Sequence, residues 1–125
     1  MKALKLEQDD VLLDIGCGDG RLSLMALEFY NIQEAIAIEW CEDWVKETKK
    51  FIKKRKWALP LNMTYEAKAY QDFDFPDRIT KCVFMAHHNG RKTLNNIKRK
   101  LKGTDCELFV HNFGHQDSIF VEVVE

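Results

Sequence analysis

The feature that most constrains this chain is a glycine-rich turn that directly follows a short apolar run. Residues 11–15 read Val-Leu-Leu-Asp-Ile, and glycines stand at positions 16, 18 and 20. An apolar run of this length that ends at glycines is typical of a buried parallel strand. Residues 21–30 then have the spacing of an amphipathic helix. The sequence therefore predicts a strand, a tight turn and a helix, which together open a βαβ unit.

The spacing of the three glycines separates this turn from two other ligand-binding loops. The dinucleotide fingerprint needs a glycine where this chain has Arg21, and a phosphate-binding P-loop needs Gly-Lys followed by Ser or Thr, which is absent. The turn instead has the acidic-x-Gly-x-Gly-x-Gly form, beginning at Asp14. Glycine permits the sharp bend, and the missing side chains let a ligand press against the backbone. We therefore expect a site for a nucleoside that has no pyrophosphate.

An acid at the end of the next apolar run completes the expected nucleoside site. Residues 35–38 read Ala-Ile-Ala-Ile, and Glu39 follows, 19 residues after Gly20. At the carboxyl end of a parallel strand, a carboxylate can accept two hydrogen bonds from ribose hydroxyls. Trp40 comes next and is expected to pack against the face of the base.

Strands and helices alternate along the chain. Apolar periodicity predicts strands over residues 11–15, 35–38, 62–69, 79–86, 107–113 and 119–124, and helices over 21–30, 42–56 and 91–102. This alternation predicts an α/β fold, with a mostly parallel, Rossmann-like sheet and helices on both faces. The last connection, at Gly114, is too short for a crossover helix, so the sixth strand should return antiparallel beside the fifth. At 125 residues the chain is expected to form one domain, 1–125.

Helical spacing also predicts which side chains face the sheet. Each helix has a stripe of apolar residues that should pack inward. The expected inward positions are Leu22, Met25, Ala26 and Phe29 in the first helix, Trp44, Val45, Thr48, Phe51 and Ile52 in the second, and Leu94, Ile97 and Leu101 in the third.

From Asp14 to Arg21 the sequence Asp-Ile-Gly-Cys-Gly-Asp-Gly-Arg resembles the opening motif of the class I, seven-strand methyltransferases that use S-adenosylmethionine (SAM). More narrowly, it is similar to the small protein-lysine methyltransferases of archaea, whose mitochondrial relatives modify carrier and ATP synthase subunits. The likeness continues through Val83-Phe84-Met85 and the helix to Lys102 and recurs at residues 111–113. The resemblance implies a shortened class I methyltransferase fold, SAM as the cofactor and a protein lysine as the methyl acceptor.

The resemblance also assigns roles within the expected site. SAM carries an amino acid moiety in place of a pyrophosphate, so Asp14 should attract its ammonium and free backbone amides near the helix start should meet its carboxylate. The family places Asp or Asn after the third strand to meet the adenine amino group. Here Tyr70 aligns with that position and Asp72 lies nearby, so either Tyr70 stacks or Asp72 substitutes. The expected cofactor-binding residues are Asp14, Gly16, Cys17, Gly18, Gly20, Glu39, Trp40, Tyr70 and Asp72.

Two further departures from the family bear on activity. The relatives carry a helical segment before the first strand that helps close the SAM pocket, whereas ten residues precede Val11 here. The family's usual last pair of strands is also reduced to one strand in this chain. Such a chain can be a minimal enzyme, can need a partner or self-association to complete an open SAM site, or can be a non-catalytic SAM-binding scaffold subunit.

Candidates for the chemical step are Tyr70 and two histidines after the fourth expected strand. His87 and His88 could orient a nucleophile or take its proton, or they could cap the following helix. The tetrapeptide Asn/Asp-Pro-Pro-Tyr, which methyltransferases acting on base or glutamine amines carry here, is absent. An aromatic-lined mouth would favour the neutral form of a lysine amine. The candidates for that mouth are Tyr65, Tyr70, His87, His88 and Phe113.

Positive charge is concentrated in two stretches, although the formal net charge is only −1. Residues 49–56 and 91–102 each contain six Lys or Arg. These stretches can be solvated helix faces. They also leave open an alternative function, an RNA methyltransferase that seats RNA on the two basic helices. A protein substrate is the favoured partner.

Cysteine and histidine spacing predicts no metal site. The four cysteines include no Cys-x-x-Cys pair, and the four histidines have no recognised ligand spacing. Reduced thiols are expected. The first residues lack the apolar core of a signal peptide, and no apolar run approaches the length of a membrane span. The chain is therefore expected in the cytoplasm.

Overall fold

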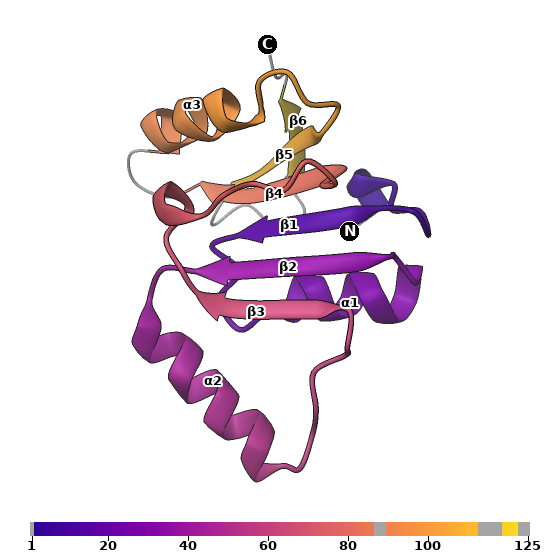
Figure 1. The fold of residues 1–125 in the computed structure, drawn as a ribbon, viewed down its shortest axis with the longest axis vertical. Helices are drawn as coiled ribbons and strands as arrows, with labels where there is room; N and C mark the ends of the chain where they lie inside the picture. Colours follow the sequence, from indigo (N-terminus) through magenta and orange to yellow (C-terminus); the bar gives the residue numbers. More distant parts are fainter. Residues whose placement is uncertain (1, 87–89, 113–118, 123–125) are drawn as a thin grey trace.

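The structure is a computed structural model that describes the chain except residues 1, 87–89, 113–118 and 123–125. Figure 1 shows one twisted sheet flanked by helices. The strands are β1 (Val11–Ile15), β2 (Glu34–Glu39), β3 (Met63–Ala67), β4 (Lys81–Ala86), β5 (Glu107–Asn112) and β6 (Ile119–Glu122). The helices are α1 (Arg21–Tyr30), α2 (Glu42–Lys54) and α3 (Gly90–Leu101), with the short 3-10 helices η1 (Lys2–Leu4) and η2 (Tyr70–Asp72). No helix in this described part of the chain has the length and apolar character needed to cross a membrane.

The strands are ordered β3-β2-β1-β4-β5-β6. Neighbours from β3 to β5 are all parallel, and β6 runs antiparallel to β5, with Phe109 opposite Val121. The predicted parallel sheet and its antiparallel last strand are therefore confirmed. The direction of strand addition reverses between β1 and β4. In open α/β sheets, ligands bind at such a switch point, in the crevice at the carboxyl ends of the strands.

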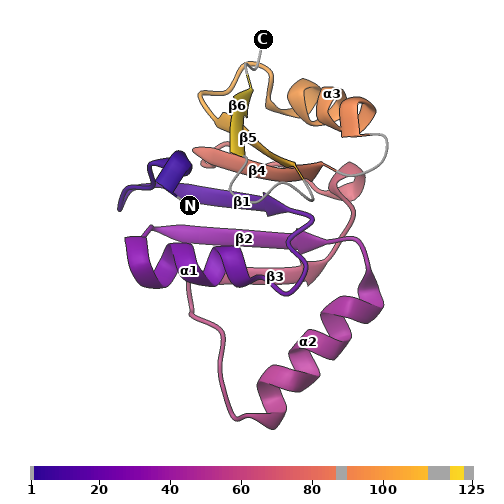
Figure 2. The ribbon, with the colours of Figure 1, turned by 180° about the vertical axis from the view of Figure 1, so that it is seen from behind.

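Both faces of the sheet are buried, which explains why its strands read as unbroken apolar runs. Successive side chains of β1 point to opposite faces and join two separate cores. Leu12 lies in one core with Ala26 of α1, and Leu13 lies in the other with Ile97 of α3. Figure 2 shows α1 in front of the sheet, on the face turned away from the viewer in Figure 1.

The inward face of α3 is as predicted, with Leu94, Ile97 and Leu101 buried. In α1 the prediction is confirmed for Ala26 and in part for Leu22, which is half-buried, but it is wrong for Met25 and Phe29. The buried residues of α1 are Ser23, Ala26 and Leu27, while Phe29 is 68% exposed. The helix is rotated so that the Ser23 hydroxyl reaches the buried carboxylate of Asp14. Apolar spacing alone could not predict this rotation, because it ranks a serine as an outward residue.

In α2 the predicted inward stripe is confirmed for Val45, which is buried, and in part for Thr48 and Ile52, which are half-buried, but it is wrong for Trp44 and Phe51. Trp44 and Phe51 are 53% and 49% exposed. Both views show the reason, since α2 starts at the end of β2 and then leans away from the sheet (Figures 1 and 2). Only the first turns of the helix are close enough to the sheet to bury a side chain.

Lys81, at the start of β4, is a buried cation that holds the N-terminal segment on the sheet. Its side chain is 9% exposed, and its Nζ donates to the backbone carbonyls of Leu4 and Lys5. The same Nζ lies 3.6 Å from Oδ2 of Asp10 and 3.9 Å from Oε1 of Glu107. A buried lysine requires such partners, because leaving its charge unpaired away from water is unfavourable.

Replacing Lys81 by Met should lower the free energy of unfolding by about 3 kcal/mol, because Asp10 and two carbonyls lose their buried partner. Urea denaturation followed by circular dichroism measures this change. Lys102→Met, at an exposed position after α3, is the matched control and should change it by less than about 0.5 kcal/mol. Equal small effects in the two variants would contradict the role given to Lys81.

Candidate functional site

A cavity of about 410 Å³ opens at the carboxyl edge of the sheet, beside the switch point. Its walls come from the ends of β1, β2 and β4, from the segment after β3 and from the first turn of α3. A cavity of this size can hold most of a small organic ligand. The lining residues are Ile15, Gly16, Glu39, Trp40, Lys68, Ala69, Tyr70, Gln71, Phe84 and Thr93.

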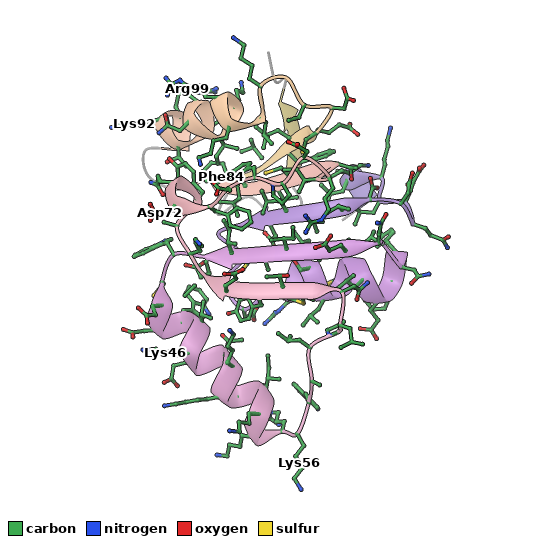
Figure 3. The ribbon with its side chains drawn as sticks, viewed as in Figure 1. Lys46, Lys56, Asp72, Phe84, Lys92 and Arg99 are labelled. Carbon is green, nitrogen blue, oxygen red and sulfur yellow. The ribbon has the colours of Figure 1, made fainter. Side chains whose placement is uncertain are left out.

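Part of the predicted cofactor-binding set lines this cavity. The lining members are Gly16, Glu39, Trp40 and Tyr70. The members that do not line it are Asp14, Cys17, Gly18, Gly20 and Asp72. Asp72 is exposed on η2, and Figure 3 shows it at the outer edge of the molecule. His87 and His88, the histidine candidates for the chemical step, lie outside the described residues, as does Phe113.

Gly16 is the place where the backbone of the glycine turn faces the cavity. Its φ of +74° is a conformation that side-chain-bearing residues rarely adopt. A Cβ added at Gly16 would meet no atom within 4 Å. The missing side chain therefore leaves open space that a ligand can enter, and it does not serve internal packing.

Glu39 holds the glycine turn in place and also lines the cavity. The residue is 5% exposed, and its two carboxylate oxygens accept the backbone amides of Gly18 and Cys41, each at 3.0 Å. These bonds tie the glycine turn to the start of α2. A carboxylate oxygen can accept more than one hydrogen bond, so Glu39, which lines the cavity, keeps acceptor capacity for ligand hydroxyls.

Of the other two glycines of the turn, Gly20 is closely packed, whereas Gly18 is required for its φ of +59° and a Cβ there would make an ordinary van der Waals contact. Gly20 precedes α1 with φ +78°, and a Cβ there would lie 3.0 Å from Cε of Met63. A Cβ at Gly18 would lie 3.5 Å from Cζ2 of Trp44. Of the three glycines, Gly16 is therefore the one with direct access to the cavity.

The backbone amides of the turn already have acceptors within the protein. Gly16 and Cys17 both donate to the carbonyl of Ile38, at 2.9 and 3.1 Å, and Gly20 donates to that of Cys17 at 3.0 Å. The amide of Gly18 is held by a side chain, as described above. The expectation of free amides for a ligand carboxylate is therefore wrong at these four positions, because the turn folds its donors inward.

Tyr65 is not at the mouth where sequence reasoning places it. It is 5% exposed, and its hydroxyl donates to the carbonyl of Gly18 at 2.8 Å. Along β3 the buried side chains alternate, so Tyr65 points to the same face as Met63, toward α1 and the glycine turn. Burial raises the pKa of Tyr65, which keeps its hydroxyl a donor.

Asp14 is a buried acid directly beneath the turn. It is 4% exposed, and its Oδ2 accepts the hydroxyl of Ser23 at 3.2 Å. Burial raises the pKa of Asp14 from 3.8 to about 7; the hydrogen bond from Ser23 opposes this rise, and the negative charges of Glu39 and Asp19 add to it. A carboxyl group whose pKa is raised strongly by burial and by neighbouring charges is typical of functional sites.

Two aromatic side chains flank the cavity. Trp40 is 74% exposed at the end of β2, and its ring is available for stacking. Tyr70 packs partly against the core under α3. Its hydroxyl accepts a hydrogen bond from Nδ2 of Asn96, at 3.2 Å. The hydrogen bond from Asn96 fixes the Tyr70 ring, whereas most of the Trp40 ring is exposed to solvent.

Sequence reasoning missed lining residues on four segments. They are Ile15, Lys68, Ala69, Gln71, Phe84 and Thr93. A signal existed for Ile15 and Phe84, since both lie toward the carboxyl ends of predicted strands that flank the switch point. No comparable signal marks Gln71 or Thr93, because their place depends on how the segment after β3 and the start of α3 fold over the sheet edge.

The four described cysteines are all free. Cys82 and Cys106 are buried, and burial raises the pKa of both thiols. Burial raises the pKa of Cys17 as well, so this thiol of the glycine turn is a poor nucleophile at neutral pH. Within the residues that the structure describes, no group of three or more His, Cys, Asp or Glu is placed to hold a metal ion.

Comparison with known proteins gives a family and a partial relative. Residues 12–104 match the family described as a methyltransferase domain. A protein-lysine N-methyltransferase of Saccharolobus islandicus (strain REY15A) is 34% identical over 47 residues, which make up 38% of this chain and 29% of that protein.

Solved structures share the fold. A putative S-adenosylmethionine dependent methyltransferase from Listeria monocytogenes matches with a TM-score of 0.68 and 19% identity, over 87% of this chain and 50% of that one. The M. jannaschii TYW2 structure in complex with AdoMet matches with a TM-score of 0.69 and 18% identity, over 88% and 48%. The predicted Rossmann-like methyltransferase fold is confirmed, and the chain spans about half the length of these two proteins.

Replacing Asp14 by Asn should stabilise the protein at high pH and not at low pH. The folded pKa of Asp14 is above its unfolded value, so wild-type stability falls as pH rises from about 4 to about 7, where the folded carboxyl ionises. Removing this charge should raise the free energy of unfolding by about 3 kcal/mol at pH 8. At pH 4 the two proteins should be equally stable. Urea titrations at the two pH values measure the difference, and a variant less stable at pH 8 would contradict the burial argument.

Proposed function

We propose that the cavity binds S-adenosylmethionine and that the protein methylates a lysine amine of another protein. The chain belongs to the methyltransferase domain family, and the proposal builds on that membership. The observation that carries the cofactor part is the pairing of Gly16 and Glu39 at one cavity. Gly16 offers backbone with no side chain in front of it, and Glu39 offers a buried carboxylate. Both stand where α/β sheets bind nucleosides.

The residues present fit the cofactor. The ribose of SAM has two neighbouring hydroxyls, and Glu39 retains acceptor capacity at the cavity wall. The flat adenine needs an apolar or aromatic surface, which Trp40, Tyr70 and Phe84 supply. The ammonium needs a nearby negative charge, and Asp14 lies beneath the turn. Members of the same fold bind this ligand, as the AdoMet complex of TYW2 illustrates.

Bound SAM supplies an activated methyl group on a positively charged sulfur, with a good leaving group built in. What remains for the protein is to hold the acceptor in line and to exclude water. Gly16 and Glu39 fix one end of the ligand, and the ring of Tyr70, held by Asn96, is a rigid wall of the same cavity. His87 and His88 stay candidates for orienting the acceptor or taking its proton.

A lysine acceptor is supported by the partial relative, which is a protein-lysine N-methyltransferase. It is also consistent with the walls of the cavity. A lysine amine has a reference pKa near 10.4 and must lose a proton before it can attack. Apolar surroundings favour the neutral amine, and Ile15 and Ala69 make a further part of the cavity wall apolar.

Replacing Gly16 by Ala should weaken SAM binding at least about ten-fold, because the new methyl group enters the space next to the ligand. Calorimetric titration with SAM measures this. Gly103→Ala is the matched control: φ there is +84°, a Cβ would also meet nothing within 4 Å, and the turn after α3 is remote from the cavity lining. Both variants should lose similar stability, but only Gly16→Ala should lose SAM affinity. Absence of SAM binding to the wild type would overturn the cofactor proposal.

Incubating the wild type with methyl-labelled SAM and a lysate of its host should label protein bands. The label should be sensitive to protease, resistant to nuclease and recovered as methyl-lysine after acid hydrolysis. Gly16→Ala, tested in the same way, should give much less label. If nuclease removes the label, the methyl acceptor is RNA and the lysine proposal is wrong. Binding of SAM without any transfer would leave a SAM-binding scaffold.

A further inference from the structure

The second half of α2 and the segment that follows it carry aromatic side chains that the described fold leaves about half exposed. Phe51 and Trp57 are 49% and 60% exposed, and Leu61 is fully exposed beyond them. The end of α2 and the start of the connection to β3 lie away from the sheet (Figure 1). Neighbouring exposed aromatic rings of this kind mark interaction surfaces more often than isolated exposed apolar residues do.

The same surface is strongly positive. Residues 48–65 contain six Lys or Arg and no Asp or Glu. All six are exposed. By contrast, the first half of α2 has acids, with Lys46 paired to Glu42 at 3.3 Å and Lys50 to Glu47 at 3.8 Å. The excess charge therefore gathers around the end of the helix, together with the aromatic rings.

A hollow of about 440 Å³ joins these two features. It lies between the end of α2 and the segment that follows. Its lining consists of Lys49, Ile52, Lys53, Lys56, Trp57, Ala58 and Leu59, so three ammonium groups surround an apolar floor and one indole, without a carboxylate. Such a hollow suits a planar, uncharged ring that is joined to negative groups.

Arg55 stiffens the rim of this surface. Its guanidinium carbon lies 4.2 Å from the ring centre of Phe51 and 5.7 Å from that of Trp57. The two rings are themselves in edge contact, with centres 5.9 Å apart. The three side chains therefore form one platform, which keeps the Trp57 ring in place before any ligand binds.

The other basic stretch, on α3, is different. Nζ of Lys100 donates to the carbonyls of Gln71 and Phe73 and lies 5.1 Å from the ring of Phe75, and Arg99 is bonded to Asn96. Lys100 therefore holds the segment after β3 in place, whereas Arg99 is engaged within α3. Figure 3 shows Lys92 and Arg99 at the opposite end of the molecule from Lys56, so the two stretches do not form one surface.

We infer that residues 49–59, which form the end of α2 and the segment that follows it, are a docking surface for single-stranded RNA. The phosphates would meet the lysines, and one base would stack on Trp57 in the hollow. Recognition of unpaired bases by aromatic rings beside Lys and Arg is the general physics of single-strand binding. This docking does not depend on SAM or on the identity of the methyl acceptor.

Charge and ring chemistry favour RNA over other occupants. A second copy of this chain would bring the same cations against each other, which is unfavourable. An acidic protein segment would satisfy the lysines but carries no dense series of planar rings for the Trp57 hollow. Duplex DNA keeps its bases stacked inside and offers only phosphates.

The test is fluorescence anisotropy of a labelled oligouridylate of about twelve nucleotides with the whole chain, from about 50 to 200 mM salt. We expect saturable binding that weakens steeply with salt. Lys53→Ala with Lys56→Ala should make the salt dependence shallower by about 1.4 in the log–log slope, because two phosphate contacts are lost. Trp57→Ala should weaken binding about ten-fold. Circular dichroism checks that both variants remain folded.

Two controls match these variants. Lys46→Ala removes a lysine from the first half of α2 that already pairs with Glu42, and Phe29→Ala removes an exposed ring on α1. Each should change RNA affinity less than about two-fold. Three results would overturn the inference: no binding at low salt, equal binding of duplex DNA or polyglutamate with no effect of Trp57→Ala, or sedimentation showing that Trp57→Ala breaks a dimer.

Discussion

The candidate site depends on the way the Glu39 carboxylate is held at the end of β2. Its two oxygens accept the amides of Gly18 and Cys41, so one buried charge fixes both the glycine turn and the start of α2. The turn is further held by the hydroxyl of Tyr65 on the carbonyl of Gly18. With the turn fixed in this way, Gly16 is left facing the cavity with its backbone bare. A ligand that meets Glu39 therefore meets a site whose shape is already set.

The site concentrates buried acids in a way that a purely structural design would avoid. Asp14 and Glu39 are both nearly inaccessible to solvent, and the negative charge of Glu39 contributes to the raised pKa of Asp14. Ser23 is the neutral side chain that partly compensates for the burial of Asp14. A positively charged ligand nearby would relieve the repulsion between these two acids. This electrostatic environment is consistent with a ligand that carries an ammonium and a sulfonium.

The position of α2 links the proposed ligand site to the proposed docking surface. The helix begins beside Glu39 and Trp40 at the cavity and ends at the basic, aromatic surface around Trp57. Because it leans away from the sheet, Trp44 and Phe51 are left about half exposed, in contrast to the buried apolar residues of α3. One element thus contributes to both regions while burying little of its own surface.

Residue pattern was enough to predict the strands, the helices and their order, because a buried parallel strand, a glycine turn and an amphipathic helix each have a local sequence signature. It determined the antiparallel last strand as well, since the connection at Gly114 is short. Only the tertiary structure decided which of three similar glycines opens to the cavity, that Tyr65 braces the turn, and that Trp44 and Phe51 of α2 stay exposed. These outcomes depend on how far and at what angle one element lies from another, and residue periodicity reports only which face is apolar.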